Sequence, residues 1–180
     1  MVKINIMKKF VLLIVVAFAI IIACKSGTES KANVLTVTLE PKSGSKVSGT
    51  ATFTEKDGKV TLLAKISGLD PGTHAIHIHA KADCSAGDAT SAGGHWNPTL
   101  KKHGKWGEAE HHKGDIGNFT TNQYGEGTVL FSTDEWCIGC GDETKDITGK
   151  GLIVHADPDD FTTQPTGNAG ARVACAGIIK

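Results

Sequence analysis

The 180-residue chain lacks net charge, a long apolar run and a helical hydrophobic repeat, and each absence excludes a class of protein. Its 19 basic and 19 acidic residues cancel, and without residues 1–23 the balance is 16 against 19, because Lys3, Lys8 and Lys9 are lost. A slightly acidic domain argues against nucleic acid as the partner. The longest apolar run, from Phe10 to Ala23, has fourteen residues and is too short to span a bilayer comfortably. After this run, no segment shows a long apolar period of 3.6, so a helical domain is not expected.

The first residues have the pattern of an export signal. Three lysines precede the apolar run, which ends in Ile21-Ile22-Ala23-Cys24, a sequence that resembles the lipobox of bacterial lipoproteins. We therefore predict a lipoprotein signal peptide at 1–23, a lipid on Cys24, a flexible tether at 24–33 and a folded domain at 34–180. The protein would then be exported and anchored to a membrane of the bacterial cell envelope, on its periplasmic or cell-surface side. The alternative is an ordinary secretory signal with a coincidental cysteine.

Short alternating segments separated by turns indicate that the rest of the chain is β structure. Residues 34–39 alternate strictly between apolar and polar types, and the turn signal Lys56-Asp57-Gly58 separates two further segments. With 22 glycines, this pattern predicts a sandwich or barrel. Two long insertions, residues 81–118 and 156–170, are expected to be functional loops. The expected strands are 34–39, 47–55, 59–66, 75–80, 127–132, 151–154 and 172–179.

Seven side chains of metal-ligand type stand out among these segments. On an extended strand, His77 and His79 point to the same side, while Ile76 and Ile78 point to the opposite side, toward a core. One such pair alone would be read as two unrelated surface histidines. Imidazole nitrogens suit copper and zinc, and three histidines with one carboxylate can close a tetrahedral zinc site. The full set is His77, His79, His95, His103, His112, Asp115 and His155.

Five stretches together resemble the copper/zinc superoxide dismutase family, in the family's order and with its ligand spacing. They are GTHAIHIH (72–79), SAGGHWNP (91–98), HKGDIGN (112–118), VHADPDD (154–160) and GNAGARVAC (167–175). The resemblance covers nearly everything from Val34 to the C-terminus. It implies an all-β domain, an eight-stranded Greek-key β-sandwich or barrel with two long functional loops. It also implies the cofactors copper and zinc, and superoxide as the substrate.

The resemblance assigns a role to each ligand-type residue. By position, His95 matches the histidine that bridges both metals, and it would also take part in catalysis by gaining and passing on a proton. Asp159 matches a carboxylate that joins a copper ligand to a zinc ligand, here His77 and His103. Arg172 matches the arginine that holds the incoming anion beside copper. The implied copper ligands are His77, His79, His95 and His155, and the implied zinc ligands are His95, His103, His112 and Asp115.

Two histidines are left over. His74 lies on the face opposite to His77, so we expect a core histidine whose ring is paired with backbone groups. His111 is the neighbour of His112, and the family pattern selects His112. We therefore expect His111 to be a solvated neighbour.

The five cysteines divide into three kinds. Cys24 is assigned to the lipid, and the other four would meet an oxidising environment after export. By resemblance, Cys84 and Cys175 form the family disulfide. The pair Cys137-Ile-Gly-Cys140 lies outside the family pattern, and three interpretations stay open: a local disulfide, a redox-active pair and a copper-loading site. A local disulfide that stiffens its loop is the preferred one.

Two functions compete on this pattern. The first is a superoxide dismutase that converts superoxide to oxygen and hydrogen peroxide by copper redox cycling, with zinc supporting the imidazolate bridge. The second is a non-catalytic copper- and zinc-binding module of the cell envelope. The presence of all four copper-side histidines and of Arg172 favours the enzyme. A homodimer stays open, because family members pair through different faces or not at all.

Overall fold

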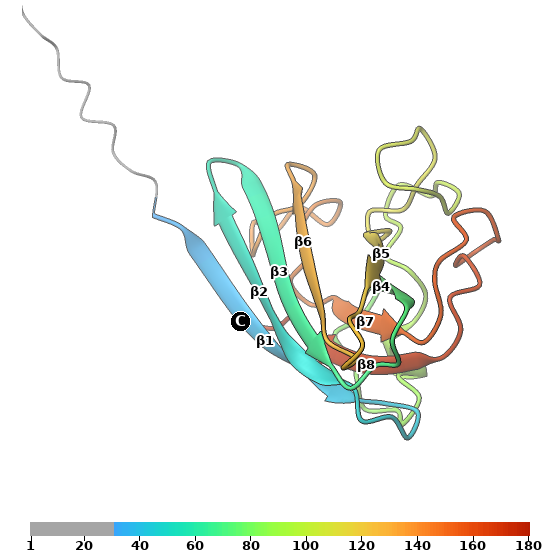
Figure 1. The fold of residues 1–180 in the computed structure, drawn as a ribbon. Helices are drawn as coiled ribbons and strands as arrows, with labels where there is room; N and C mark the ends of the chain where they lie inside the picture. Colours follow the sequence, from blue (N-terminus) through green and yellow to red (C-terminus); the bar gives the residue numbers. More distant parts are fainter. Residues whose placement is uncertain (1–30) are drawn as a thin grey trace, which may run out of the picture.

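The computed structural model describes residues 31–180, in which eight antiparallel strands form a nearly closed barrel (Figure 1). The predicted signal peptide at 1–23, Cys24 and most of the predicted tether lie outside the described residues. The strands are β1 (Asn33–Pro41), β2 (Ser48–Lys56), β3 (Lys59–Ser67), β4 (Thr73–His79), β5 (Gly117–Thr120), β6 (Gly127–Thr133), β7 (Gly151–His155) and β8 (Arg172–Gly177), with one short 3-10 turn η1 (Thr90–Ala92).

The order of the strands is β5-β4-β7-β8-β1-β2-β3-β6. A bridge between Thr121 and Gly127 brings the two end strands together, so the sheet curls into a barrel with almost no free edge. The connections β3–β4 and β6–β7 cross from one half of the barrel to the other, as Greek-key topology requires. The all-β Greek-key prediction is therefore confirmed.

In the half of the barrel built from β1, β2, β3 and β6, the alternation of apolar and polar residues explains which side chains are buried. On β3, Val60, Leu62, Ala64 and Ile66 are buried in the core, while the residues between them face outward. The predicted turn between β2 and β3 is present. Its residues Asp57 and Gly58 have φ of 51° and 76°, and a tight hairpin of the common type needs a positive φ at both positions.

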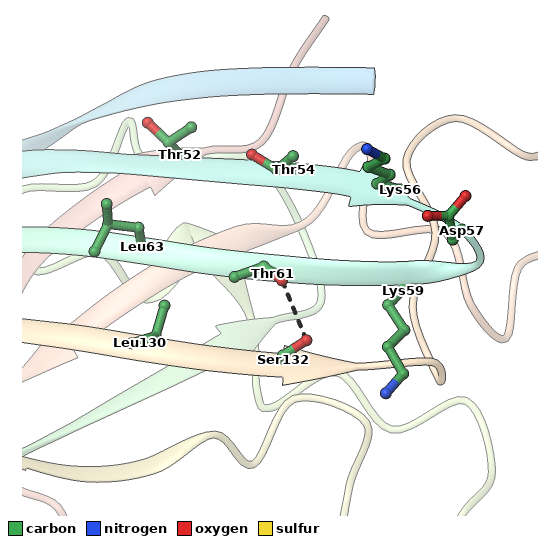
Figure 2. Close-up of a pocket in the computed structure, with 9 residues that line it drawn as sticks. All are labelled: Thr52, Thr54, Lys56, Asp57, Lys59, Thr61, Leu63, Leu130 and Ser132. Carbon is green, nitrogen blue, oxygen red and sulfur yellow. Dashed lines mark hydrogen bonds between the residues drawn. The ribbon is translucent and has the colours of Figure 1, made fainter. Parts of the chain in front are cut away.

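The outer face of β2, β3 and β6 is rich in threonine (Figure 2). Thr61 and Ser132 share a hydrogen bond of 3.1 Å across neighbouring strands, and Leu63 and Leu130 lie beside them on the same face. A shallow hollow of about 620 Å³ lies here and is lined by no histidine or cysteine. The ligand-type residues are therefore held by other parts of the barrel.

The other half of the barrel is covered on both sides. Every residue of β7 is buried, and so are six of the seven residues of β4, because the long loops lie over the outer face of these strands. Ile76 and Ile78 belong to the barrel core, as the sequence predicts, and His77 and His79 point to the opposite side under the loops. In Figure 1 these loops extend from the β4, β5, β7 and β8 side, away from β1 and β2.

The structure differs from the predicted strand list in two places. Residues 117–120 form β5, whereas the sequence places 117 and 118 in a loop, because four residues are too few for a clear alternation. Residues 134–150 form a third long connection, between β6 and β7. Within residues 31–180, no helix has the length and apolar character needed to cross a membrane.

Candidate metal centre

The candidate centre lies between the outer face of β4 and β7 and the loop of residues 80–116. His77 and His79 come from β4, and His155 is the last residue of β7. A single antiparallel bridge joins His79 to His95, which carries the loop back against the strand. The remaining residues follow on the same loop before β5 begins.

Four imidazole rings converge at one end of the centre. Each offers one ring nitrogen within 4.8 Å of the others, and all four rings are almost fully buried. The converging nitrogens find no hydrogen-bond partner among residues 31–180; they are Nδ1 of His77 and Nε2 of His79, His95 and His155. Buried nitrogens without partners are costly, and a copper ion is a cation that would satisfy four such nitrogens at once. The residues therefore fit the group that the sequence assigns to them.

Backbone carbonyls fix the orientation of two of these rings. His79 Nδ1 lies 2.9 Å from the carbonyl oxygen of Gly93, so it donates and leaves Nε2 free of a proton. His155 Nδ1 faces the carbonyl oxygen of Gly170 at the longer distance of 3.5 Å. The rings are thus oriented for binding at Nε2.

Three imidazoles and one carboxylate converge at the other end. Asp115 Oδ1 lies 2.7 Å from Nδ1 of His95 and 3.3 Å from Nδ1 of His112, and Asp115 Oδ2 lies 3.0 Å from Nδ1 of His103. Asp115 also accepts the backbone N–H groups of His112 and Gly104, at 2.8 and 3.2 Å, which holds it in place. Three nitrogens and an oxygen are the donor set of a closed tetrahedral zinc site. His95 belongs to both groups, through Nε2 on one side and Nδ1 on the other.

The charge states of the metal-free centre follow from burial and from the carboxylates. Burial holds the pKa of His79 and of His155 well below 6.5. Burial also lowers the pKa of His95 to about 4, although its hydrogen bond to Asp115 opposes the change. For His103, burial is outweighed by the hydrogen bonds to two carboxylates, which raise its pKa to about 9. Neutral imidazole is the form that binds one metal ion, so the rings of His79 and His155 can bind without losing a proton.

Asp159 connects the two groups of histidines by hydrogen bonds to one ring of each. Its Oδ2 lies 2.8 Å from Nε2 of His77, and its Oδ1 lies 2.9 Å from Nε2 of His103. Although the side chain is buried, these hydrogen bonds hold its pKa below the usual range. Asn118 on β5 exchanges two 2.8 Å hydrogen bonds with the Asp159 backbone, and a Cβ at Gly167 would lie 1.8 Å from Asp159 Oδ1. Asn118 closes one of the quoted stretches, and sequence reasoning gave it no role.

A disulfide and a small apolar cluster fix the side of the centre on which Arg172 lies. The structure joins Cys84 to Cys175, and Cys175 is buried in a cluster with Ala89, Ala92 and Ile153. Arg172 Nη1 donates a 2.7 Å hydrogen bond to the carbonyl oxygen of Ala89, on the loop that this disulfide holds. The guanidinium lines a cleft of about 290 Å³ together with His79, His155, Thr166, Asn168, Ala169 and Gly170.

The two leftover histidines have different outcomes. His74 is buried, and its ring nitrogens lie 2.7 Å from the carbonyl oxygen of Ala156 and 2.8 Å from that of Asp70, so the prediction of a backbone-paired core histidine is confirmed. The prediction of a solvated His111 is wrong. Its side chain is buried, its Nδ1 lies 2.8 Å from the carbonyl oxygen of Glu108, and its ring packs against Trp106 at 4.8 Å.

The second cysteine pair forms a disulfide within its own loop. Cys137 and Cys140 are joined, and the Asp146 carboxylate lies close to their sulfur atoms. This arrangement corresponds to the preferred of the three interpretations, the local disulfide. Two disulfides in one small domain indicate an oxidising compartment outside the cytoplasm.

The fold and the two convergent ligand sets define a class of protein, a Greek-key β-barrel with side chains able to bind two adjacent metal ions. Comparison with known proteins places the chain within this class. The family model for copper/zinc superoxide dismutase matches residues 47–178, and the chain belongs to that family. A crystal structure of the clock protein EA4 is similar to this chain, with 33% identity and a TM-score of 0.70, over 81% of this chain and 94% of that one. The resemblance read from the sequence is therefore confirmed at the level of the family.

Proposed function

We propose that this protein is a superoxide dismutase that converts two superoxide ions and two protons to oxygen and hydrogen peroxide. One observation supports the proposal above the others: four buried histidine nitrogens without hydrogen-bond partners among the described residues converge on one position, and three histidines converge with Asp115 on an adjacent one. Family membership supports the same reaction.

The copper-ligand atoms follow from which nitrogens are left without partners, and the zinc-ligand atoms from which ones converge with Asp115. Copper would be held by Nδ1 of His77 and by Nε2 of His79, His95 and His155. Zinc would be held by Nδ1 of His95, His103 and His112 and by a carboxylate oxygen of Asp115. Copper, when bound, exchanges one electron with each superoxide, whereas zinc has no redox chemistry.

The chain contributes binding, orientation and a proton. Arg172 is positioned by Ala89 beside the copper-side histidines, and its fixed positive charge would attract and hold the superoxide anion in the cleft. His95 Nε2 would gain a proton in one half of the cycle and donate it to the reduced oxygen species in the other. Asp159, which is hydrogen-bonded to His77 and His103, would keep these two rings aligned during this exchange.

A second candidate is a copper- and zinc-binding module without turnover. It is favoured by one observation, that the similar solved structure carries the name of a clock protein. Both candidates predict metal binding, so metal binding alone does not separate them. The intact copper side, with Arg172 beside it, favours the enzyme.

The test is to load the purified domain with both metals and to measure metal content and superoxide consumption together. We expect one copper and one zinc per chain and catalytic loss of superoxide. His155 contributes to the copper group alone, so His155→Ala should lose copper and activity but keep zinc. Both metals at full occupancy without superoxide consumption would support the binding module and contradict the enzyme.

We also propose that the protein is exported and held at a membrane by a lipid on Cys24. The apolar run before Cys24 and the oxidising compartment indicated by two disulfides support this proposal. Several acyl chains on one residue would give a stable anchor, whereas a single chain would bind only reversibly.

A further inference from the structure

The connection between β6 and β7, residues 134–150, lies against the loop that carries the zinc-side residues. It contains the second cysteine pair and Trp136, which is 1% exposed. Its contacts with the zinc-side loop have no part in the function proposed above. They fall on both sides of His112 in the sequence.

After His112, the contact is made with Lys113. Trp136 Nε1 donates a 2.8 Å hydrogen bond to the backbone carbonyl oxygen of Lys113, and the Lys113 ammonium pairs with the carboxylate of Glu135. Lys113 lies between His112 and Asp115 in the sequence. The backbone between these two zinc-side residues is therefore held by a buried indole.

Before His112, the contact is made through rings. Trp106 lies between His103 and His112 in the sequence, and its ring meets Trp136 edge to face at 5.9 Å and packs on His111 at 4.8 Å. Phe131 on β6 closes the cluster, at 4.9 Å from Trp106 and 5.0 Å from Trp136. Aromatic pairs at these distances contribute beyond simple burial.

The 134–150 connection is itself firmly braced. Cys137 is joined to Cys140, and its backbone is hydrogen-bonded to Lys145 at 2.9 Å and to Ile147 at 3.1 Å. The carboxylate of Asp146 accepts three backbone N–H groups, each at 2.9 Å, from Gly139, Gly141 and Thr148. Trp136 is thus attached to a rigid support immediately next to the disulfide.

We propose that Trp136 is a positioning residue for the zinc site, which holds the His112–Asp115 segment in its metal-binding geometry through the Lys113 carbonyl and Trp106. The proposal rests on the function proposed above, because it assigns zinc to this site. The segment between His103 and His112 has no strand of its own, so without this support it would have to be ordered when zinc binds. Loss of groups that orient metal ligands typically weakens metal binding by about 10- to 100-fold.

The experiment compares Trp136→Phe with the wild-type domain. Phenylalanine keeps a ring but removes the N–H donor to Lys113. We expect the zinc dissociation constant, measured by chelator competition, to rise about tenfold or more. With cobalt(II) in place of zinc, the visible ligand-field bands should shift or broaden. Copper affinity should stay unchanged, because the copper-side rings come mainly from β4 and β7.

Thr61→Val is the matched control, since it also removes one hydrogen bond but on the outer face of β3 (Figure 2). It should leave zinc affinity and the cobalt spectrum as in the wild type. Trp106→Leu is the second variant, because Trp106 is only partly buried and its loss should leave the barrel folded. It should weaken zinc binding in the same direction.

The outcomes separate the two proposals. A wild-type domain that binds no zinc would contradict the proposed function. Wild-type zinc binding with an unchanged affinity and cobalt spectrum in Trp136→Phe would overturn the positioning role. If Trp136→Phe does not fold, Trp106→Leu decides by the same measurements. Equal loss of zinc and copper affinity would also overturn the proposal, because it would show a general structural defect.

Discussion

Replacing both Cys84 and Cys175 by alanine should lower the unfolding free energy of the metal-free domain more than removing the Cys137–Cys140 disulfide does. The bridge spans a sequence separation of 91 residues, which the loop-entropy relation converts to about 4–5 kcal/mol of unfolding free energy. The second bridge spans a separation of 3, for which the same relation gives about 2 kcal/mol. Because net stabilities of domains are about 5–15 kcal/mol, the first loss approaches the whole stability of a marginal domain. Alanine is chosen because a serine hydroxyl would be buried without a partner in the apolar cluster around Cys175.

The assay is urea unfolding of the two double-alanine variants and the wild type, followed by tryptophan fluorescence in the presence of a chelator. The chelator removes the stabilisation that bound metal would add. We expect the first variant to lose about 2–3 kcal/mol more than the second, and to unfold with a steeper dependence on urea, because its unfolded chain is no longer cross-linked. Equal losses, or a larger loss for Cys137→Ala/Cys140→Ala, would refute the reasoning from loop length.

Three other changes test separate parts of the account. Arg172→Ala should keep both metals and lower the second-order rate with superoxide by about tenfold or more, with a weaker dependence on salt; an unchanged pulse-radiolysis rate would assign Arg172 to structure alone. In the metal-free domain, the pKa of His95 is about 4 in the folded state and 6.5 in the unfolded state, so between these pH values His95 binds a proton more readily when the chain is unfolded. The unfolding free energy should therefore fall by about 3 kcal/mol as the pH falls from 6.5 to 4. His103, whose pKa is about 9, has the opposite effect and should lower stability as pH rises from 6.5 to 9, which gives a maximum near pH 6.5 in urea midpoints. A steady rise in stability from pH 6.5 to 9 would contradict this assignment. Cys24→Ser should release the protein from membranes or block its processing, and a natural N-terminus that is soluble and unmodified by mass spectrometry would refute the lipid anchor.

The features that the sequence predicts well have a local physical origin. Alternation decides which side of a strand is buried, so His77 and His79 could be placed together on one face and Ile76 and Ile78 in the core. The hairpin at Asp57-Gly58 was predictable for the same reason, because its backbone needs residues that tolerate a positive φ. The spacing of the ligand-type residues carried the family resemblance.

The features that the sequence does not predict depend on contacts between distant segments. The hydrogen bond from Trp136 to Lys113 joins residues that are 23 positions apart and lie on two different loops. No periodic pattern in the sequence predicts such a contact. His111 is buried because Trp106 packs on it. The sequence predicts a solvated His111 only because the family pattern selects its neighbour His112 as the ligand. Asn118 fixes Asp159 from a strand of four residues, which is too short to recognise by alternation.

The likeness to the clock protein EA4 makes the separation of fold from activity the main question for this chain. The match to the family model establishes the family but not turnover, because function depends on the site and not on the fold. The site differs from a mere metal store in one respect that can be tested, the guanidinium of Arg172 fixed beside the copper-side histidines. A metal store would have no need of a fixed guanidinium that lines the same cleft as His79 and His155.

The rate of superoxide decay in the presence of the copper- and zinc-loaded domain tests the central claim most directly. The zinc-loaded domain without copper provides the reference in the same pulse-radiolysis experiment. We predict a second-order rate constant that approaches the diffusion ceiling of roughly 10⁸–10⁹ M⁻¹s⁻¹ for the loaded domain and no acceleration for the reference. Superoxide that decays no faster with the fully loaded domain than with the copper-free one would contradict the enzyme.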